Sequence, residues 1–242
     1  MKLPVSCAQC MNEAKEYPFI LGNVEFNDDG RYEIHCPKGH TSITVLQQQK
    51  FEVLFEIGAY AILDGYYREA VSSFTSALER FYEYYIKLIC YTKNIDLEEV
   101  ENTWKIVTNQ SERQLGAFIF IHLLETGNKP NLLTNNQISF RNAVIHKGKI
   151  PTKEEAIAYG QAILDLVRPQ IKRLKGEYAD AIGWLTHLHL IKSRKSSDKQ
   201  LSISTLSIST ILTLLSVEHP HNERKLEDAI SHLKRWEFKD YI

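Results

Sequence analysis

The sequence predicts a mainly α-helical protein with a small β domain at its N-terminus and a small α or α/β extension at its C-terminus. Residues 1–45 contain short alternating runs between two pairs of cysteine or histidine residues. Over residues 46–176, apolar residues recur three and four positions apart, which is typical of packed helices. Residues 177–242 lose this regularity and include a segment rich in serine and threonine. We therefore divide the chain into these three domains.

The composition is that of an ordinary globular chain. Of the 242 residues, 43% are hydrophobic and 24% are charged, so the chain can bury a sizeable core. The formal net charge is −1 at pH 7, so no overall basic field indicates nucleic-acid binding. A local basic patch is nevertheless enough to contact a nucleic acid.

No targeting segment or membrane span is predicted. The first residues, MKLPVSCAQCMNEAKEY, lack the apolar run of a secretory signal. The late stretch LSISTLSISTILTLLSV is too rich in serine and threonine for a spanning helix, which needs about 20 mostly apolar residues. The four cysteines do not form the pattern of a secreted disulfide framework. We therefore expect a cytoplasmic protein without a membrane partner.

Four residues of the N-terminal domain have metal-ligand spacing. Cys7 and Cys10 form a C-x-x-C pair, and Cys36 and His40 form a C-x-x-x-H pair. The intervening VEFNDDGRYEIH predicts a β-hairpin around Asp-Gly, which would bring the two pairs together. Three sulfurs and one imidazole suit tetrahedral zinc, and the segment resembles a Cys3His zinc ribbon. Because the protein would fill all four positions, we expect a structural zinc.

Two alternatives concern this domain. His35 is a rival ligand, but as the neighbour of Cys36 in a strand it should point away from the same metal. The ribbon is also a possible nucleic-acid adaptor with the helices as its scaffold. Basic residues are few there, namely Lys15, Arg31 and Lys38, which weighs against that hypothesis.

The recurrence of apolar residues predicts that the helical pattern begins at Val45, with two long helices separated by Asp64-Gly65. The second is expected to be about 26 residues long with one apolar stripe, and Tyr82, Tyr84 and Tyr85 are interpreted as core and rim rather than as base-stacking groups. Residues 97–133 predict two more helices, of which the second covers Arg113–Glu125.

Next comes a short helix over Ile138–Lys147, stopped by Gly148. Thr152 and Glu155 then form a capping box that starts another long helix, which Pro169 kinks or ends.

The C-terminal extension gives weaker signals. Residues 192–200 are interpreted as a linker, and LSIST then occurs twice in succession, with a β-branched content that favours a strand. The final segment predicts an amphipathic helix capped near Asn222, with four residues facing inward: Leu226, Ile230, Leu233 and Trp236.

The stretch FRNAVIHKGK contains side chains suited to RNA chemistry. Asn142 and His146 are four apart and share a helix face, whereas Arg141 and His146 lie about 140° apart on the helix. A histidine exchanges protons near neutrality, an arginine binds phosphate, and Lys147 and Lys149 add positive charge that can contact RNA. By spacing alone, Arg141 in a surface ion pair and His146 bonded to carbonyls at the helix end remain the simpler interpretation.

The wider segment resembles the HEPN superfamily, small helical domains found in prokaryotic toxins, defence proteins and some eukaryotic proteins. The family motif is an arginine followed four to six residues later by a histidine, commonly with a polar residue after the arginine, and here it is RNAVIH. The flanks FRNAVIHKGKIPTKEEAIAYGQAILDLV and YYREAVSSFTSALERFYEYYIK also match the family pattern, over about residues 45–175.

The resemblance implies a HEPN-like helical bundle that dimerises and cleaves RNA without a catalytic metal. Arg141 and His146 would be the motif pair and Asn142 the polar position. Glu79 is an acidic position of the long helix for which the cleft is one interpretation and an ordinary solvated glutamate is the simpler one. We expect a homodimeric toxin or antiviral defence effector, to which a neutralising or regulatory partner can bind. Regulation by nucleotidylation is not expected, because Gly148 stands where such members have a tyrosine. The alternative is a non-catalytic HEPN dimer that senses a nucleotide or binds a protein.

Overall fold

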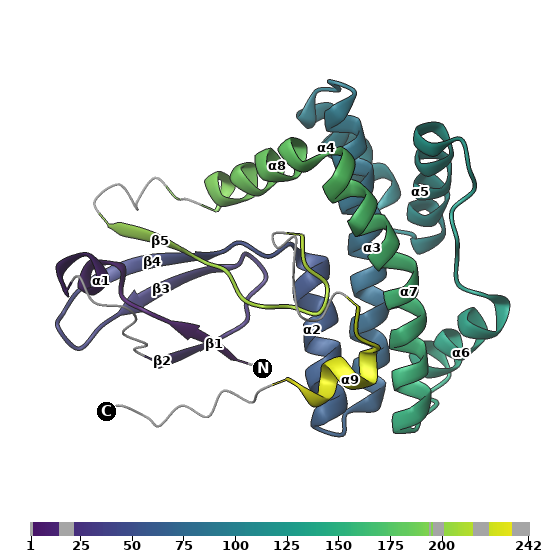
Figure 1. The fold of residues 1–242 in the computed structure, drawn as a ribbon, viewed down its shortest axis with the longest axis horizontal. Coiled ribbons are helices and arrows are strands. Elements are labelled where there is room, and N and C mark those ends of the chain that lie inside the picture. Colours follow the sequence, from purple (N-terminus) through teal and green to yellow (C-terminus); the bar gives the residue numbers. More distant parts are fainter. Residues whose placement is uncertain (1, 15–21, 194, 196–200, 215–222, 234–242) are drawn as a thin grey trace. The chain divides into compact units, whose positions relative to one another are not determined.

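The computed structural model describes residues 2–14, 22–193, 195, 201–214 and 223–233 (Figure 1). These residues form two compact units. The first contains the described parts of Met1–Gln48 and Trp184–Ser209, and the second contains those of Gln49–Gly183 and Thr210–His232. Helices predominate and the sheets are small, which confirms the mainly helical class.

The first unit contains two small sheets. In one, β1 (Lys2–Val5) pairs antiparallel with β2 (Gly22–Glu25). In the other, β4 (Thr41–Leu46) is the central strand, antiparallel to β3 (Arg31–His35) and parallel to β5 (Ser202–Leu206). The short helix α1 (Ala8–Ala14) follows β1.

Two predictions for this region are wrong. The strands on either side of Asp28–Gly30 do not pair with each other, because β2 pairs with β1 and β3 pairs with β4. A turn signal marks where the chain reverses, but it does not choose the partner of each strand. The helical pattern also does not begin at Val45, which lies in β4 between two hydrogen-bonded neighbours.

The described residues of the C-terminal extension fall in both units. The first LSIST copy forms β5, where Ser204 Oγ lies 3.0 Å from Thr44 Oγ1, but the second copy is not a strand. Further on, α9 (Leu226–Ser231) begins after Lys225, so the helix starts later than predicted. The predicted cap Asn222 and the inward Trp236 lie outside the described residues, as do most residues of the predicted linker.

The second unit is helical, and its helices agree with the predicted number and order as far as α7. The two long helices separated by Asp64-Gly65 are confirmed, and the later one has the expected 26 residues. The predicted helices of this unit correspond to α2 (Lys50–Leu63), α3 (Tyr67–Thr92), α4 (Leu97–Val107), α5 (Ser111–Thr126), α6 (Asn135–His146) and α7 (Lys153–Glu177). The next helix, α8 (Ala179–Lys192), was not predicted and contributes residues to both units.

Helix α3 lies at the centre of this unit and packs against α2, α5, α6 and α7 (Figure 1). Its Phe74 is fully buried between two glycines. A Cβ atom added at Gly58 of α2 would lie 2.7 Å from the Phe74 ring, and one added at Gly160 of α7 would lie 2.6 Å from it. Glycine at both positions therefore lets the three helices approach closely.

The sequence predicts one apolar stripe along α3, but the buried surface of this helix is wider than that stripe. Tyr82, Tyr84 and Tyr85 are all buried, as expected of core residues, but so are residues on other faces of the helix. The Thr75 hydroxyl, for example, is buried and lies 3.0 Å from the Tyr159 hydroxyl of α7. A helix surrounded by others buries more than one face.

The predicted glycine stops on either side of α6 are confirmed, but α6 begins at Asn135, earlier than the predicted Ile138. Gly127 ends α5 and Gly148 follows α6, and both have the positive φ that favours glycine, 70° and 73°. The capping box of α7 is present: the Thr152 hydroxyl accepts the Glu155 N–H, and the Glu155 carboxylate accepts the Thr152 N–H. The loop between α6 and α7 is thus fixed at both ends.

Helix α2 carries two buried glutamates, Glu52 and Glu56, one turn apart. Glu52 accepts the N–H groups of Gln49 (2.7 Å) and Leu214 (2.9 Å), and Glu56 accepts the N–H of Ile211 (2.9 Å). Both carboxylates therefore attach an irregular buried segment to the helical core. Burial raises the pKa of each carboxyl from 4.5 to about 7, and the hydrogen bonds offset this only in part.

These raised pKa values predict a pH-dependent stability. Since the folded pKa lies above 4.5, the contribution of each carboxyl to the free energy of unfolding is fully present below pH 4.5 and is lost as the pH rises through about 7. Glu56→Gln keeps an oxygen for the Ile211 N–H and cannot ionise. We expect this variant to reduce the loss between pH 4.5 and 7.5 by up to about 3 kcal/mol, measured by urea unfolding followed by circular dichroism.

The matched control for this experiment is Glu69→Gln, since Glu69 is exposed on α3. The control should reproduce the wild-type pH dependence. If Glu56→Gln does the same, Glu56 does not titrate in this range and the prediction is wrong.

Candidate functional site

The four predicted metal ligands are positioned by two turns of the first unit. Cys7 directly precedes α1 and Cys10 lies in the first turn of that helix. Cys36 and His40 flank the turn between β3 and β4, where the Cys36 N–H donates to the His40 carbonyl at 3.0 Å. Gly39 closes this turn with a φ of 82°. The β3–β4 hairpin therefore reverses at the second ligand pair.

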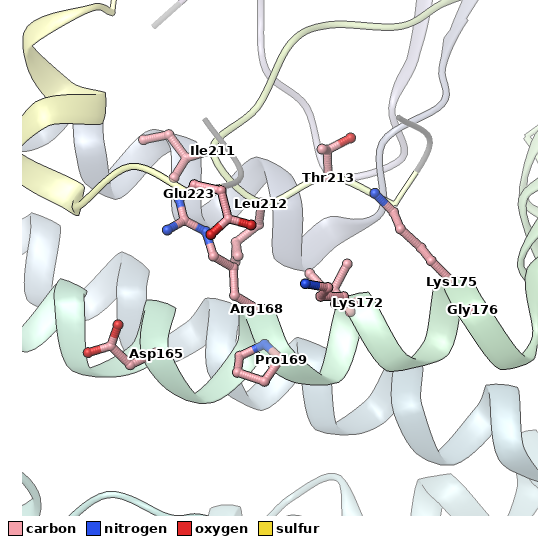
Figure 2. Close-up of a pocket in the computed structure, with 11 residues that line it drawn as sticks. Asp165, Arg168, Pro169, Lys172, Lys175, Gly176, Ile211, Leu212, Thr213 and Glu223 are labelled. Carbon is pink, nitrogen blue, oxygen red and sulfur yellow. The ribbon is translucent and has the colours of Figure 1, made fainter. Parts of the chain in front are cut away.

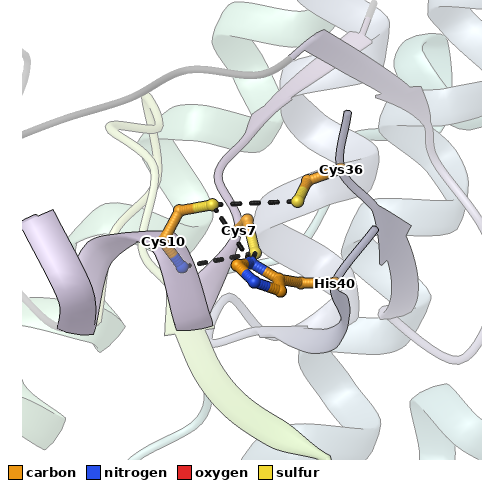
Figure 3. A group of neighbouring side chains, drawn as sticks. All are labelled: Cys7, Cys10, Cys36 and His40. Carbon is orange, nitrogen blue, oxygen red and sulfur yellow. Dashed lines mark hydrogen bonds between the residues drawn. The ribbon is translucent and has the colours of Figure 1, made fainter. Parts of the chain in front are cut away.

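The four side chains converge on one point (Figure 3). Their ligand atoms all lie within 4.8 Å of one another. Cys10 Sγ lies 3.7 Å from Cys36 Sγ, while His40 Nδ1 lies 3.3 Å from Cys10 Sγ and 3.9 Å from Cys7 Sγ. A tetrahedral ion with metal–sulfur bonds of about 2.3 Å and a metal–nitrogen bond of about 2.05 Å separates such ligands by about 3.6–3.8 Å. The cluster can therefore bind one metal ion.

The surroundings of the cluster favour a cation. The three cysteines are buried, and burial, followed by the neighbouring sulfurs of Cys36 and Cys7, raises the pKa of Cys10 to about 11. At Cys7 and Cys36, burial acts to raise the pKa, but hydrogen bonds outweigh it, so both pKa values are lowered. Thiolates at these positions would repel one another, and a positive ion would offset that repulsion. The far nitrogen of His40, Nε2, lies 3.7 Å from the Glu13 carboxylate, which resembles the outer partner of many metal-bound histidines.

His35 is not part of this cluster. Its imidazole is exposed, with Nδ1 3.1 Å from Thr41 Oγ1 and Nε2 3.5 Å from the Glu33 carboxylate. The expectation that it points away from the ligands of the metal is confirmed.

A second candidate site lies at α6 in the other unit. Arg141 borders a hollow of about 100 Å³, formed between α3, α5, α6 and α7. The Nε atom of Arg141 is buried, and no described residue accepts a hydrogen bond from it. The other lining residues are Thr75, Leu78, Glu79, Tyr82, Ser111, Glu112, Leu115, Leu132, Leu133, Ile138 and Tyr159.

Glu79 lines the same hollow as Arg141. Burial raises the pKa of the Glu79 carboxyl; Arg80 and Arg141 lower it in part, whereas Glu112 raises it further. Glu112 and Tyr159 were not identified from the sequence, since no motif connects them to α6. The hollow thus places a guanidinium near a carboxyl that is protonated more readily than usual, among apolar walls.

The remaining predicted residues lie outside this hollow. Asn142 is half-buried, while His146 is exposed in the last turn of α6 and Lys147 directly follows it. Lys149 forms an ion pair with Glu155, at 2.5 Å. Within one chain, therefore, the hollow contains Arg141 without His146, Asn142 or the two lysines.

The comparisons do not assign a family. The chain matches no protein-family model, no curated protein and no solved structure. Among the described residues, we find no helix with the length and hydropathy needed to cross a membrane.

From the Cys3His cluster we predict the number of metal ions that each chain binds. We expect about one metal ion per chain by elemental analysis, and loss of that ion in Cys10→Ala, because three ligands bind less tightly than four. Cys90→Ala is the control, since Cys90 lies on α3 outside the cluster. Equal metal content in the two variants would show that the cluster does not bind the ion.

Proposed function

We propose that this protein is a metal-independent endoribonuclease of the HEPN type, in which α6 carries the catalytic residues, and that its Cys3His cluster binds a structural zinc ion. The observation that carries the nuclease proposal is the hollow at α6. Arg141 lines this hollow, and the Nε atom of its half-buried side chain has no hydrogen-bond partner among the described residues. The exposed imidazole of His146 lies outside the hollow, five residues later on the same helix.

Each residue has a role that its chemistry allows. Arg141 would bind the scissile phosphate through its forked N–H groups and stabilise the charge that develops on it. His146 would take the proton of the RNA 2′-hydroxyl, and Asn142 would orient the imidazole. The 2′-oxygen then bonds to phosphorus, and the bond to the 5′-oxygen breaks as that oxygen takes a proton from water. The proton held by His146 neutralises the resulting hydroxide and restores the neutral imidazole. The products are a 2′,3′-cyclic phosphate and a 5′-hydroxyl end.

A dimer would complete the site. Arg141 and His146 lie about 140° apart around α6, so they face different directions in one chain. The site requires a dimer in which the exposed His146 of one chain reaches the half-buried Arg141 of the other. Lys147, which is exposed, would add positive charge along the RNA, and Lys149 would do so after leaving its ion pair with Glu155. The ribonuclease would then act only as a homodimer, as a toxin or defence effector that a neutralising partner can block.

Zinc is the ion that best suits the first unit. Three thiolates and one imidazole at tetrahedral separations are a preferred donor set of Zn²⁺, and four protein ligands leave no position for a substrate. The ion would join α1 to the β3–β4 turn and would take no part in RNA cleavage. Reduced thiols are required, which suits the cytoplasm.

The first test is RNA cleavage by purified protein in EDTA, with its zinc content measured afterwards. We expect His146→Ala to cleave at least about 100-fold more slowly, because general acid–base groups contribute about 10²–10⁴ in rate. The control is His187→Ala, a histidine of α8 that should leave the rate unchanged. Equal rates for the His146 and wild-type proteins would contradict the catalytic assignment.

The second test addresses the shared site. Arg141→Ala and His146→Ala chains, carrying different tags, are co-expressed and purified through both tags. Each variant alone should be inactive. A mixed dimer retains one intact site of two, so we expect about half of the wild-type rate. If mixed dimers form but remain inactive, the two residues do not meet across chains.

A further inference from the structure

Besides the hollow at α6, the helical unit has a larger cavity and an exposed apolar face. The cavity, of about 800 Å³, lies beside α7 (Figure 2). Two acidic residues that line it, Glu223 and Asp165, attract Arg168 of the same cavity, so the chain itself supplies partners for charge there. The apolar face belongs to α5 and shares no residue with the cavity.

The face of α5 that points away from α3 is apolar and uncovered. On the opposite face, the buried Phe118 and His122 rings stack on tyrosines of α3. On the outer face, Phe120, Leu123 and Leu124 are 72%, 42% and 77% exposed, so no described element covers it. In Figure 1, α5 lies at the edge of the helical unit. Exposed apolar side chains that are grouped in this way mark interaction sites.

The patch has enough apolar area for one side of a protein interface. Ile106 of α4 extends it, since Ile106 is 68% exposed and its carbonyl accepts a hydrogen bond from Arg113 of α5. With on the order of 150–200 Å² for each fully exposed side chain, Ile106 and the three α5 residues expose about 400–500 Å². A standard interface buries about 800 Å² per partner, of which roughly 57% is apolar. The two apolar areas are therefore similar.

The outer face of α5 is complementary to itself. When two copies of α5 pack antiparallel about a two-fold axis at Phe120, Gly116 of each chain lies opposite Leu124 of the other. Ala117 likewise lies opposite Leu123. A Cβ atom added at Gly116 would have no other atom within 4 Å, so the space beside this glycine is open to a leucine. Small residues of one helix thus meet large residues of the other.

Charges at the two ends of α5 favour the same arrangement. Glu112 lies in the first turn of α5, Lys129 follows its last turn, and both are exposed. Neither forms an ion pair with a residue that the structure describes. An antiparallel pair places Glu112 of each chain near Lys129 of the other, whereas a parallel pair brings like charges together. Between these ends, Gly116–Leu124 contains no acidic residue, lysine or arginine, so the matching surface is also uncharged there.

We propose that this face of α5 is a homodimer interface, in which two copies of the chain pack antiparallel with Phe120 at the two-fold axis. The contact uses neither Arg141 nor His146, so it does not rest on RNA cleavage. It would supply the second chain that the proposed ribonuclease needs, next to the hollow, because Glu112 and Leu115 of α5 line that hollow.

Sedimentation velocity of the full-length, zinc-loaded protein tests this interface. We expect dimers to form with a Kd of about 10 μM or below. Phe120→Glu should raise the Kd at least about tenfold, because it places two carboxylates beside each other in an apolar contact. Tyr66→Glu is the control, since Tyr66 is 63% exposed and lies before α3, outside this face. The control should dimerise as the wild type does.

A charge reversal tests the antiparallel direction. Glu112→Lys and Lys129→Glu should each raise the Kd about three- to tenfold, because each replaces an attraction by a repulsion at both ends of the pair. Both changes in one chain should restore the wild-type Kd.

Three outcomes would overturn the proposal. The wild type stays monomeric up to about 100 μM, Phe120→Glu dimerises as tightly as Tyr66→Glu, or the double charge reversal binds no better than the single ones. RNA cleavage is measured separately. A dimer that responds to these substitutions as expected but cleaves no RNA would support the interface and contradict the nuclease proposal.

Discussion

The packing of α3 against its neighbours is the constraint on which the helical unit depends. Phe74 occupies space that only glycine leaves free, at Gly58 on α2 and at Gly160 on α7. This close approach fixes α2 and α7 on either side of α3. One turn further along α3, Leu78 and Glu79 line the hollow beside Arg141, so the candidate catalytic arginine is positioned by the same packing.

The first unit depends on a different kind of interaction. Its sheets are small, and the segments that meet at the Cys3His cluster come from α1 and from the β3–β4 turn. Small domains of this kind have little apolar surface to bury, and a metal ion can supply the missing free energy of folding. Strand β5 adds a second long-range connection, since its backbone pairs in parallel with β4 across about 160 residues. The hydroxyl groups of Ser204 and Thr44 lie 3.0 Å apart across this pairing.

The sequence predicts the features that depend on near neighbours. The capping box of Thr152 and Glu155, the glycine after α6 and the helices on either side of Asp64-Gly65 each follow from residues a few positions apart. Pairing between distant segments is not encoded in this way. Nothing near Ser202 identifies β4 as its partner, and nothing near Glu56 shows that its carboxylate accepts the N–H of Ile211. The hairpin predicted at Asp28–Gly30 fails for the same reason. The metal ligands are the exception. The spacing within each pair is typical of metal ligands, and it therefore predicts that the two distant pairs meet.

The geometry of α6 also bears on how the proposed activity would be controlled. Arg141 and His146 lie about 140° apart around α6, and Arg141 lines the hollow together with residues of α3 and α5. His146 is exposed, so it is free to meet a second chain. If the proposed site is assembled in this way, it would exist only while two chains are associated, and a single chain would not cleave RNA. Any partner that covers the exposed end of α6 would then abolish cleavage without contacting Arg141.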